Sequence, residues 1–320
     1  MNRLPLFRTV VALVAVAALA LPAMAKDDAL SLVPANAVTV GMVKLADMRT
    51  SPLSSLLFEH TDKMSTDGEA AKFLDDTGLS PTKDVDVLVI ATAPRTSLGT
   101  EADVLVLAEG RFNAEKLTAA LIERGAIRKG AYLVLPEEEG DKPAISFSSS
   151  LVMAGTERAV TAALAARANG GTGFRSRGAL GPDLARLDPN ATAWALVDVT
   201  RAARLTKGGT IHTGKGSSGD ALQAALKTVS TLGVWAKDKG DALELGAFGL
   251  SSDAETLELL EDTIRGGLSA LRLAAREKSP DLVTVIRRFD VSRKNDAVLV
   301  EGSIPAAQLR EMMARKRAAK

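Results

Sequence analysis

The sequence contains no cysteine, so it can form no disulfide, no thiolate metal site and no lipid-bearing thiol after an export signal. Aromatic residues make up only 3% of the chain, which argues against stacking platforms for nucleobases or sugars. The 40 basic and 39 acidic residues nearly cancel, so no excess of positive charge recruits nucleic acid. The abundant residues are small and aliphatic, and this composition predicts an ordinary globular core.

The residues that usually carry catalysis are also scarce. His60 and His212 are the only histidines, and neither has a partner at metal-ligand spacing, so we predict no metal site. Either histidine could act as a general base only through tertiary contacts that the sequence does not reveal. Residues 209–216 (GTIHTGKG) resemble a phosphate-binding loop, but a glycine stands where the magnesium-binding hydroxyl belongs, which favours a flexible loop. In 216–219 (GSSG) the glycines are one residue too close for the nucleophile elbow of hydrolases. The sequence therefore predicts no catalytic residue and no cofactor.

The first 25 residues have the features of a secretory signal peptide. Arg3 and Arg8 precede the apolar run Val10–Leu21, which is well short of the ~20 residues that span a bilayer. Small residues close the segment, so we predict cleavage between Ala25 and Lys26. An uncleaved anchor is the alternative. Cleavage would give a periplasmic or secreted protein with no transmembrane helix in the mature chain.

The mature chain is long enough for two domains, because a domain usually holds ~150 residues. The apolar run Thr192–Val199 repeats a pattern set by Val38–Leu45. Each run follows a proline and leads into a helical segment with an arginine, Arg49 or Arg204. Residues 169–178 are rich in glycine, as in a linker. We therefore predict a signal peptide at 1–25 and two tandem units at 26–172 and 173–320.

Strand patterns separated by short turns predict hairpins. The β-branched runs 85–91 and 104–108 form one, and 233–237 with 242–250 form another that turns at Lys239-Gly240. A last hairpin joins 289–293 to 298–304. Because hairpins outnumber long crossovers, we predict an α+β fold in which each unit is an antiparallel sheet with helices on one face.

Helices are predicted from capping residues and apolar stripes. Asn113, Thr156 and Asp253 are suited to begin helices. The stripe of the longest helix consists of Leu257, Leu260, Ile264, Leu268 and Leu271. The pair Gly266-Gly267 interrupts that helix, and we expect a bend or a close packing contact there.

A short motif supports the internal repeat. Residues 109–117 (EGRFNAEKL) match 301–309 (EGSIPAAQL) without a gap at Glu, Gly, Ala and Leu, and 253–257 (DAETL) match the helix start again. Two unrelated strand-to-helix junctions could produce the same similarity.

The chain resembles an uncharacterised family of exported bacterial proteins. The resemblance rests on LVPANAV before the first strand, on FLDDTGLSPTKDVDVLVIA at 73–91 and on GRFNAEKL at 110–117. It covers most of the mature chain and implies a repeated α+β fold outside the cytoplasm. No activity comes with the resemblance, so it assigns no functional residue.

Three functional hypotheses follow. The first is an exported, non-catalytic protein with a binding or scaffolding role and an envelope protein or ligand as partner. The alternative is an envelope enzyme that uses carboxylates at the interface between the two units. The third is peripheral attachment through the basic C-terminal helix, residues 310–320, although its cations also complement the helix dipole. The acidic cluster at 137–141 is interpreted as a solvated hairpin tip rather than a weak calcium site.

Overall fold

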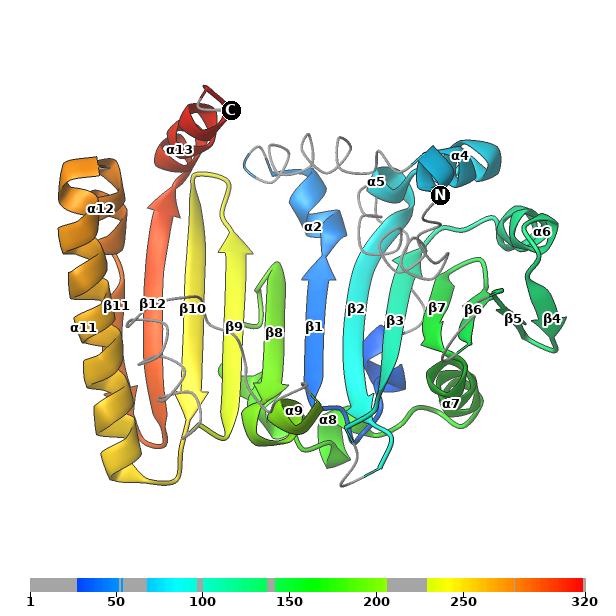
Figure 1. Ribbon diagram of the computed structural model, residues 1–320, viewed down its shortest axis with the longest axis horizontal. Coiled ribbons are helices and arrows are strands. Elements are labelled where there is room, and N and C mark those ends of the chain that lie inside the picture. Colours follow the sequence, from blue (N-terminus) through cyan, green and yellow to red (C-terminus); the bar gives the residue numbers. More distant parts are fainter. Residues whose placement is uncertain are drawn as a thin grey trace. The chain divides into compact units, whose positions relative to one another are not determined.

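The computed structural model describes residues 28–51, 53, 68–96, 100–136, 142–205, 229–278 and 280–318 (Figure 1). The predicted signal peptide, with Ala25 and Lys26, lies outside this part. The chain divides into two compact units, of which the first extends to Pro182 and the second begins at Asp183. Each unit is α+β with an antiparallel sheet, which confirms the predicted fold class. In the described part, no helix is both long enough and apolar enough to cross a bilayer.

The described strands of the first unit follow the order β1-β2-β3-β7-β6-β5-β4, and all neighbours are antiparallel. Their bounds are β1 Thr39–Lys44, β2 Val85–Pro94, β3 Ala102–Gly110, β4 Ile127–Lys129, β5 Tyr132–Val134, β6 Pro143–Phe147 and β7 Leu151–Thr156. The β2–β3 hairpin is the one that the sequence predicts. The short edge strand β4 was not predicted, because its three residues are all exposed and give no alternating pattern.

The helical segments of the first unit begin and end where polar caps and glycines allow. Their bounds are η1 Ala29–Leu32, α2 Leu45–Arg49, α4 Gly68–Thr77, α5 Pro81–Asp84, α6 Ala114–Glu123, α7 Glu157–Ala168 and α8 Phe174–Arg177. The predicted caps are confirmed: Asn113 Oδ1 accepts from the amide of Lys116 at 3.0 Å, and Thr156 Oγ1 accepts from the amide of Ala159 at 3.4 Å.

Helical segments lie against both faces of the first sheet, one layer more than the sequence predicts. On one face, Leu117 and Leu121 of α6 share a core with Val106 of β3. Alternate β3 side chains point the other way, and there Glu109 accepts a hydrogen bond from the amide of Ala29 in η1. Helix α7 contacts η1 as well as β3, β6 and β7. The second layer forms because η1 packs on this face and buries Leu30 and Leu32.

The glycine-rich segment 169–178 is fixed to η1. Thr172 Oγ1 donates to the carbonyl of Ser31 at 3.1 Å, and Phe174 is fully buried. Arg175 Nε donates to Asp28 Oδ2 at 3.2 Å. These contacts explain why the first compact unit continues to Pro182.

The second unit has the described strand order β8-β9-β10-β12-β11, again antiparallel throughout. The strands are β8 Ala193–Asp198, β9 Thr231–Asp238, β10 Ala242–Leu250, β11 Asp290–Lys294 and β12 Ala297–Pro305. The helical segments are η2 Pro182–Arg186, α9 Val199–Leu205, α11 Ala254–Lys278, α12 Pro280–Ile286 and α13 Ala306–Ala318. The predicted turn at Lys239-Gly240 is confirmed, and Gly240 has a positive φ of 82°.

Helix α11 packs against one face of this sheet, as its stripe predicts. Leu257 and Leu260 are 3% exposed and contact a core that includes Val291 and Val298. Leu271 differs from the prediction, since it is 48% exposed. Of the two expectations for Gly266 and Gly267, a bend or a close contact, the close contact is wrong within the described residues, because a Cβ added at either glycine would meet none of their atoms within 4 Å.

The two units share part of their order of elements. In each, a first strand leads into a short helix, two strands of a hairpin follow, and a helix separates them from a later strand beside the second hairpin strand. The first unit also has α4 and α5 before its hairpin and the short strands β4 and β5 after α6. The motif at 109–117 spans the end of β3 and the start of α6, whereas its match at 301–309 spans the end of β12 and the start of α13. The two matching segments therefore lie at junctions that do not correspond in the two units. The junction that corresponds to β3–α6 is β10–α11, which contains 253–257. The tandem repeat stays a prediction, which this order supports.

Candidate functional site

Most residues that the sequence analysis considered for chemistry lie outside the described part. This holds for His60, His212, residues 209–219 and the acidic cluster at 137–141. Among the described residues, no group of three or more His, Cys, Asp or Glu side chains is placed to hold a metal ion.

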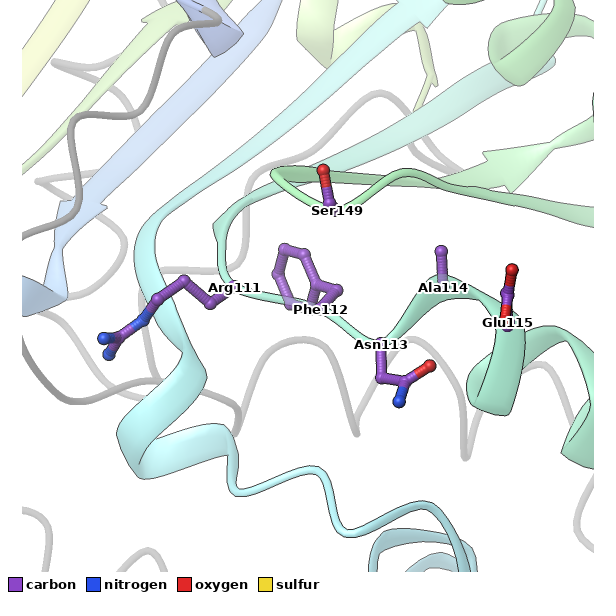
Figure 2. Close-up of a pocket in the computed structure, with 6 residues that line it drawn as sticks. All are labelled: Arg111, Phe112, Asn113, Ala114, Glu115 and Ser149. Carbon is purple, nitrogen blue, oxygen red and sulfur yellow. The ribbon is translucent and has the colours of Figure 1, made fainter.

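A shallow pocket lies at the β3–α6 junction (Figure 2). Its volume is about 650 Å³, and it is lined by Arg111, Phe112, Asn113, Ala114, Glu115 and Ser149. Two of the polar side chains already have structural partners: Arg111 Nη2 donates to the carbonyl of Lys83 at 3.0 Å, and Asn113 caps α6. The amide of Phe112 donates to the carbonyl of Ser149 at 2.9 Å. The pocket wall is therefore mainly a strand-to-helix joint, and the GRFNAEKL motif mostly serves this joint.

A buried ion pair lies in the same unit. Arg49 Nη1 is 2.8 Å from Asp86 Oδ1, and the two side chains are 6% and 7% exposed. Arg49 also donates to the carbonyl of Val85. The register of β2 and β3 shifts between Val85 and Val87, so Asp86 is the extra residue of a β-bulge, which turns its side chain toward Arg49. Desolvation lowers the pKa of Arg49, and the hydrogen bond that Arg49 donates to Asp86 opposes that effect.

Two polar atoms of this pair are left unsatisfied. Arg49 Nε and Asp86 Oδ2 are buried and have no hydrogen-bond partner among the described residues. The arginine of the corresponding helix in the second unit, Arg204, is exposed instead. The pair therefore belongs to the first unit alone and anchors α2 to the bulge.

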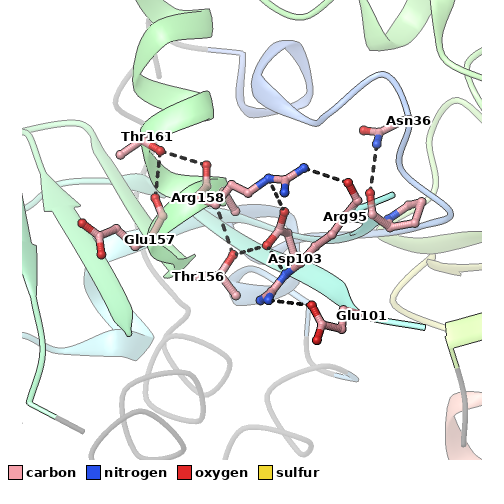
Figure 3. Close-up of polar contacts among 10 residues, drawn as sticks. Asn36, Arg95, Glu101, Asp103, Thr156, Glu157, Arg158 and Thr161 are labelled. Atoms are coloured by element: carbon pink, nitrogen blue, oxygen red, sulfur yellow. Dashed lines mark hydrogen bonds and ion pairs between the residues drawn. The ribbon is translucent and has the colours of Figure 1, made fainter. Parts of the chain in front are cut away.

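A second charged cluster fixes the far end of the β2–β3 hairpin. Figure 3 shows Arg95 and Arg158 pointing to the carboxylate of Asp103. The Nε atoms of the two arginines lie 3.0 and 3.2 Å from its oxygens, and Thr156 Oγ1 donates to Oδ1 at 3.0 Å. Arg158 Nη2 also donates to the carbonyl of Arg95 at 2.9 Å. Both carboxylate oxygens of Asp103 are engaged, so this cluster joins the hairpin to the start of α7.

The most distinctive surface of the second unit contains both tryptophans of the chain. Trp194 of β8 and Trp235 of β9 are directly opposite partners. The amide of Val199 donates to the carbonyl of Ser230, and alternation along the ladder makes the tryptophans a non-hydrogen-bonded pair. At such positions the Cα atoms are about 4.5 Å apart, so the side chains are neighbours. Both are half-buried.

Two glycines create space for aromatic rings on this face. A Cβ at Gly246 would lie 2.1 Å from the ring of Trp235, and a Cβ at Gly233 would lie 2.3 Å from the ring of Phe248. Each ring therefore lies flat over a glycine of the neighbouring strand. Leu196, which is fully buried, lies opposite Gly233 and completes the apolar floor. This face is opposite to α11, because Gly249 and Leu232, which alternate with these residues, face the α11 side.

Paired charges border the tryptophans. Lys237 Nζ donates to Asp188 Oδ2 at 2.9 Å, and Lys239 Nζ lies 2.6 Å from Glu244 Oε1. The hydrogen bond from Lys237 lowers the pKa of Asp188, and the hydrogen bond to Glu244 raises the pKa of Lys239. The surface is thus an aromatic centre with a polar edge; we call Trp194, Trp235 and this edge the tryptophan surface.

The tryptophan surface was not predicted from the sequence, because the low aromatic content does not show that Trp194 and Trp235 lie on neighbouring strands. A signal was present: Gly233 and Trp235 on one strand mirror Gly246 and Phe248 on the next. With the turn at Lys239-Gly240, this spacing pairs each aromatic residue with a glycine.

The chain was compared with known proteins. No family model matches it, and no curated protein matches it. Among solved structures, crystal form I of TP0453 is similar with a TM-score of 0.47 and 8% identity, covering 90% of this chain and 97% of that one. Crystal form III of TP0453 gives a TM-score of 0.47 and 10% identity, covering 91% and 99%.

Proposed function

We propose that the protein is an exported bacterial protein with a non-catalytic binding or scaffolding role, and that the tryptophan surface contacts its partner. The observation that carries this proposal is the direct opposition of Trp194 and Trp235 on one sheet face. Tryptophan is the residue most often found at the energetic centre of protein interfaces, and such centres are usually bordered by polar residues. A cell-envelope protein is therefore the proposed class of partner.

The rigidity of the rings supports the same role. Trp235 is held over Gly246, so little side-chain freedom is lost when a partner covers it. Anchors that are already fixed bind at a smaller entropic cost. The enzymatic alternative and attachment through the C-terminal helix stay predictions.

Export is tested first. The full chain is expressed in a bacterial host and fractionated, and the N-terminus of the product is sequenced. We expect a periplasmic or secreted product that begins at Lys26, and we expect Ala25→Arg to block processing because the cleavage pocket accepts only small residues. An intact N-terminus in the wild-type chain would contradict the signal-peptide proposal.

The tryptophan surface is tested by photo-crosslinking in the native envelope. A benzophenone amino acid replaces Trp194 or Trp235, and Ile127, which is 67% exposed in the other unit, provides the matched control. We expect both tryptophan positions to crosslink to one and the same envelope protein, identified by mass spectrometry, and Ile127 not to do so. Adducts that are absent, that contain only this chain, or that form equally at Ile127 would refute the role of this surface.

The partner is then titrated against the purified protein. Since the chain has only two tryptophans, its intrinsic indole fluorescence reports this surface alone. A tryptophan-free fragment of the partner should cause a saturable change in emission. The variant carrying Trp194→Ala should bind this fragment more weakly.

A further inference from the structure

Helix α11 has a second stripe of residues on its outward side, which contains two exposed leucines. Leu259 is 60% exposed and Leu273 is 71% exposed, whereas the inward residues Leu257 and Leu260 are 3% exposed. Gly266 lies midway between the two exposed leucines. Because the spacing is seven residues on either side, Leu259, Gly266 and Leu273 lie on one face of the helix.

The centre of this stripe is open. A Cβ built at Gly266 would meet no atom within 4 Å, so the glycine is not required by any contact within the described chain. A glycine in the middle of an exposed helix is destabilising relative to alanine. At a helix-helix contact, the same residue lets two backbones approach closely.

Exposed acidic residues are concentrated in the first half of α11. Glu255, Glu258 and Asp262 are exposed there, together with Arg265, which lies 2.8 Å from Glu261, and Arg276 is exposed in the last turn. Glu258 also lies 3.5 Å from Arg293. An antiparallel neighbour with the same sequence would place Arg276 of one helix near Glu255 and Glu258 of the other. A parallel neighbour would place like charges together.

From this geometry we infer that α11 forms an antiparallel contact with α11 of a second copy of the chain, around a two-fold axis at Gly266. The axis places Leu259 of each copy opposite Leu273 of the other, which buries all four leucines. Such an isologous contact closes on itself and gives a dimer. The inference is independent of the proposed function, because it uses a different face of the second unit.

A second copy fits this stripe better than a lipid surface does. Glu255, Glu258 and Asp262 border Leu259, and their carboxylates are repelled by the anionic lipids that attract amphipathic helices. Binding to a membrane does not require Leu259 and Leu273 to be equally far from Gly266. A two-fold axis at Gly266 does require it, because Leu259 of each copy must meet Leu273 of the other.

Cysteine crosslinking tests the geometry, since the chain has no cysteine of its own. In Gly266→Cys the two thiols meet at the axis, so we expect rapid crosslinking of the mature protein by a short bismaleimide. In Leu259→Cys the thiols of the two copies are separated by about 21 Å along the axis, from a rise of about 1.5 Å per residue, and self-crosslinking should be slow. Mixing Leu259→Cys with Leu273→Cys should restore it.

The controls make each outcome decisive. Ile127→Cys has an exposed side chain in the other unit and measures random collision. If Gly266→Cys crosslinks no faster than Ile127→Cys, the inference is wrong. Self-crosslinking of Leu259→Cys without a reaction between Leu259→Cys and Leu273→Cys would mean a parallel contact and would also overturn it.

Sedimentation equilibrium measures the association itself. We expect a concentration-dependent dimer. Leu273→Glu should raise its dissociation constant about a hundredfold, because each dimer then loses two buried leucines, one from each copy. Ile127→Glu should leave it unchanged. Since Leu273 is already exposed in the single chain, Leu273→Glu should keep the wild-type thermal midpoint at high dilution. A chain that stays monomeric and floats with phosphatidylglycerol vesicles in a Leu273-dependent manner would refute the dimer.

Discussion

The buried pair Arg49–Asp86 permits a quantitative test of how the first unit is stabilised. The side chains are 6% and 7% exposed, so removing either partner leaves an unpaired buried charge. Breaking a buried ion pair in this manner costs about 3–5 kcal/mol. We therefore expect Arg49→Met and Asp86→Leu each to lower the free energy of unfolding by that amount.

The double variant should behave differently from the sum of its parts. Arg49 Nε and Asp86 Oδ2 have no hydrogen-bond partner in the part of the chain that the structure describes, and each unsatisfied buried group costs about 1–3 kcal/mol. Replacing both residues by apolar ones removes these penalties together with the charges. The variant carrying Arg49→Met and Asp86→Leu should thus be more stable than either single variant.

The assay is urea unfolding of the mature protein at neutral pH, followed by far-ultraviolet circular dichroism. The slope of the free energy against urea should be the same in all four proteins, so that a change in midpoint reports stability. The reasoning is refuted if the two single effects simply add in the double variant, or if each single change costs less than about 1 kcal/mol, as an exposed pair would.

Three further predictions concern single positions. Gly110→Ala should destabilise the fold by at least about 1–3 kcal/mol, because its Cβ would lie 1.9 Å from the carbonyl oxygen of Asp84. Gly267→Ala is the same chemical change in open space within α11 and should instead raise stability by about 1 kcal/mol. Both stability changes are measured from urea midpoints. Two changes of the same sign would contradict the structure. The hydrogen bond to Glu157 is the main cause that raises the pKa of Tyr132, the only tyrosine. Its tyrosinate absorbance should therefore appear at higher pH than in a model peptide. Glu157→Gln should shift this titration back to lower pH. Because this folded-state pKa is raised, the stabilisation is present below the ordinary tyrosine pKa and is lost as pH rises through the raised value, and equal titration of both proteins would exclude the contact.

The elements that the sequence predicts well are those with local signals. Asn113, Thr156 and Asp253 are helix caps because a short polar side chain can reach the backbone amides of the first turn. The hairpin turn at Lys239-Gly240 is equally local, since glycine tolerates its positive φ. Such features depend on a few neighbouring residues, which the sequence displays in order.

Features that depend on distant contacts were not predictable in the same way. Asp86 pairs with Arg49 because a one-residue bulge turns it, and no pattern within β2 indicates that bulge. Segment η1 packs on the first sheet because Glu109, about 80 residues further along, accepts a hydrogen bond from the amide of Ala29, and no local pattern indicates this contact. Leu271 continues the inward stripe of α11 by spacing but is 48% exposed, because spacing predicts a face and not the extent of the partner surface.

The two proposals involve opposite faces of the sheet of the second unit, so dimerisation and partner binding can occur together. Helix α11 packs on one face, and Trp194 and Trp235 belong to the other, so the proposed dimer leaves both tryptophan surfaces accessible to partners. A dimer that presents two identical surfaces gains apparent affinity for any partner that is itself repeated or clustered in the envelope, without a new contact. Leu273→Glu should therefore weaken capture of such a partner although it leaves the tryptophan surface intact, whereas affinity for a monomeric fragment of the same partner should not change. Equal loss for both forms would mean that the two faces are not independent.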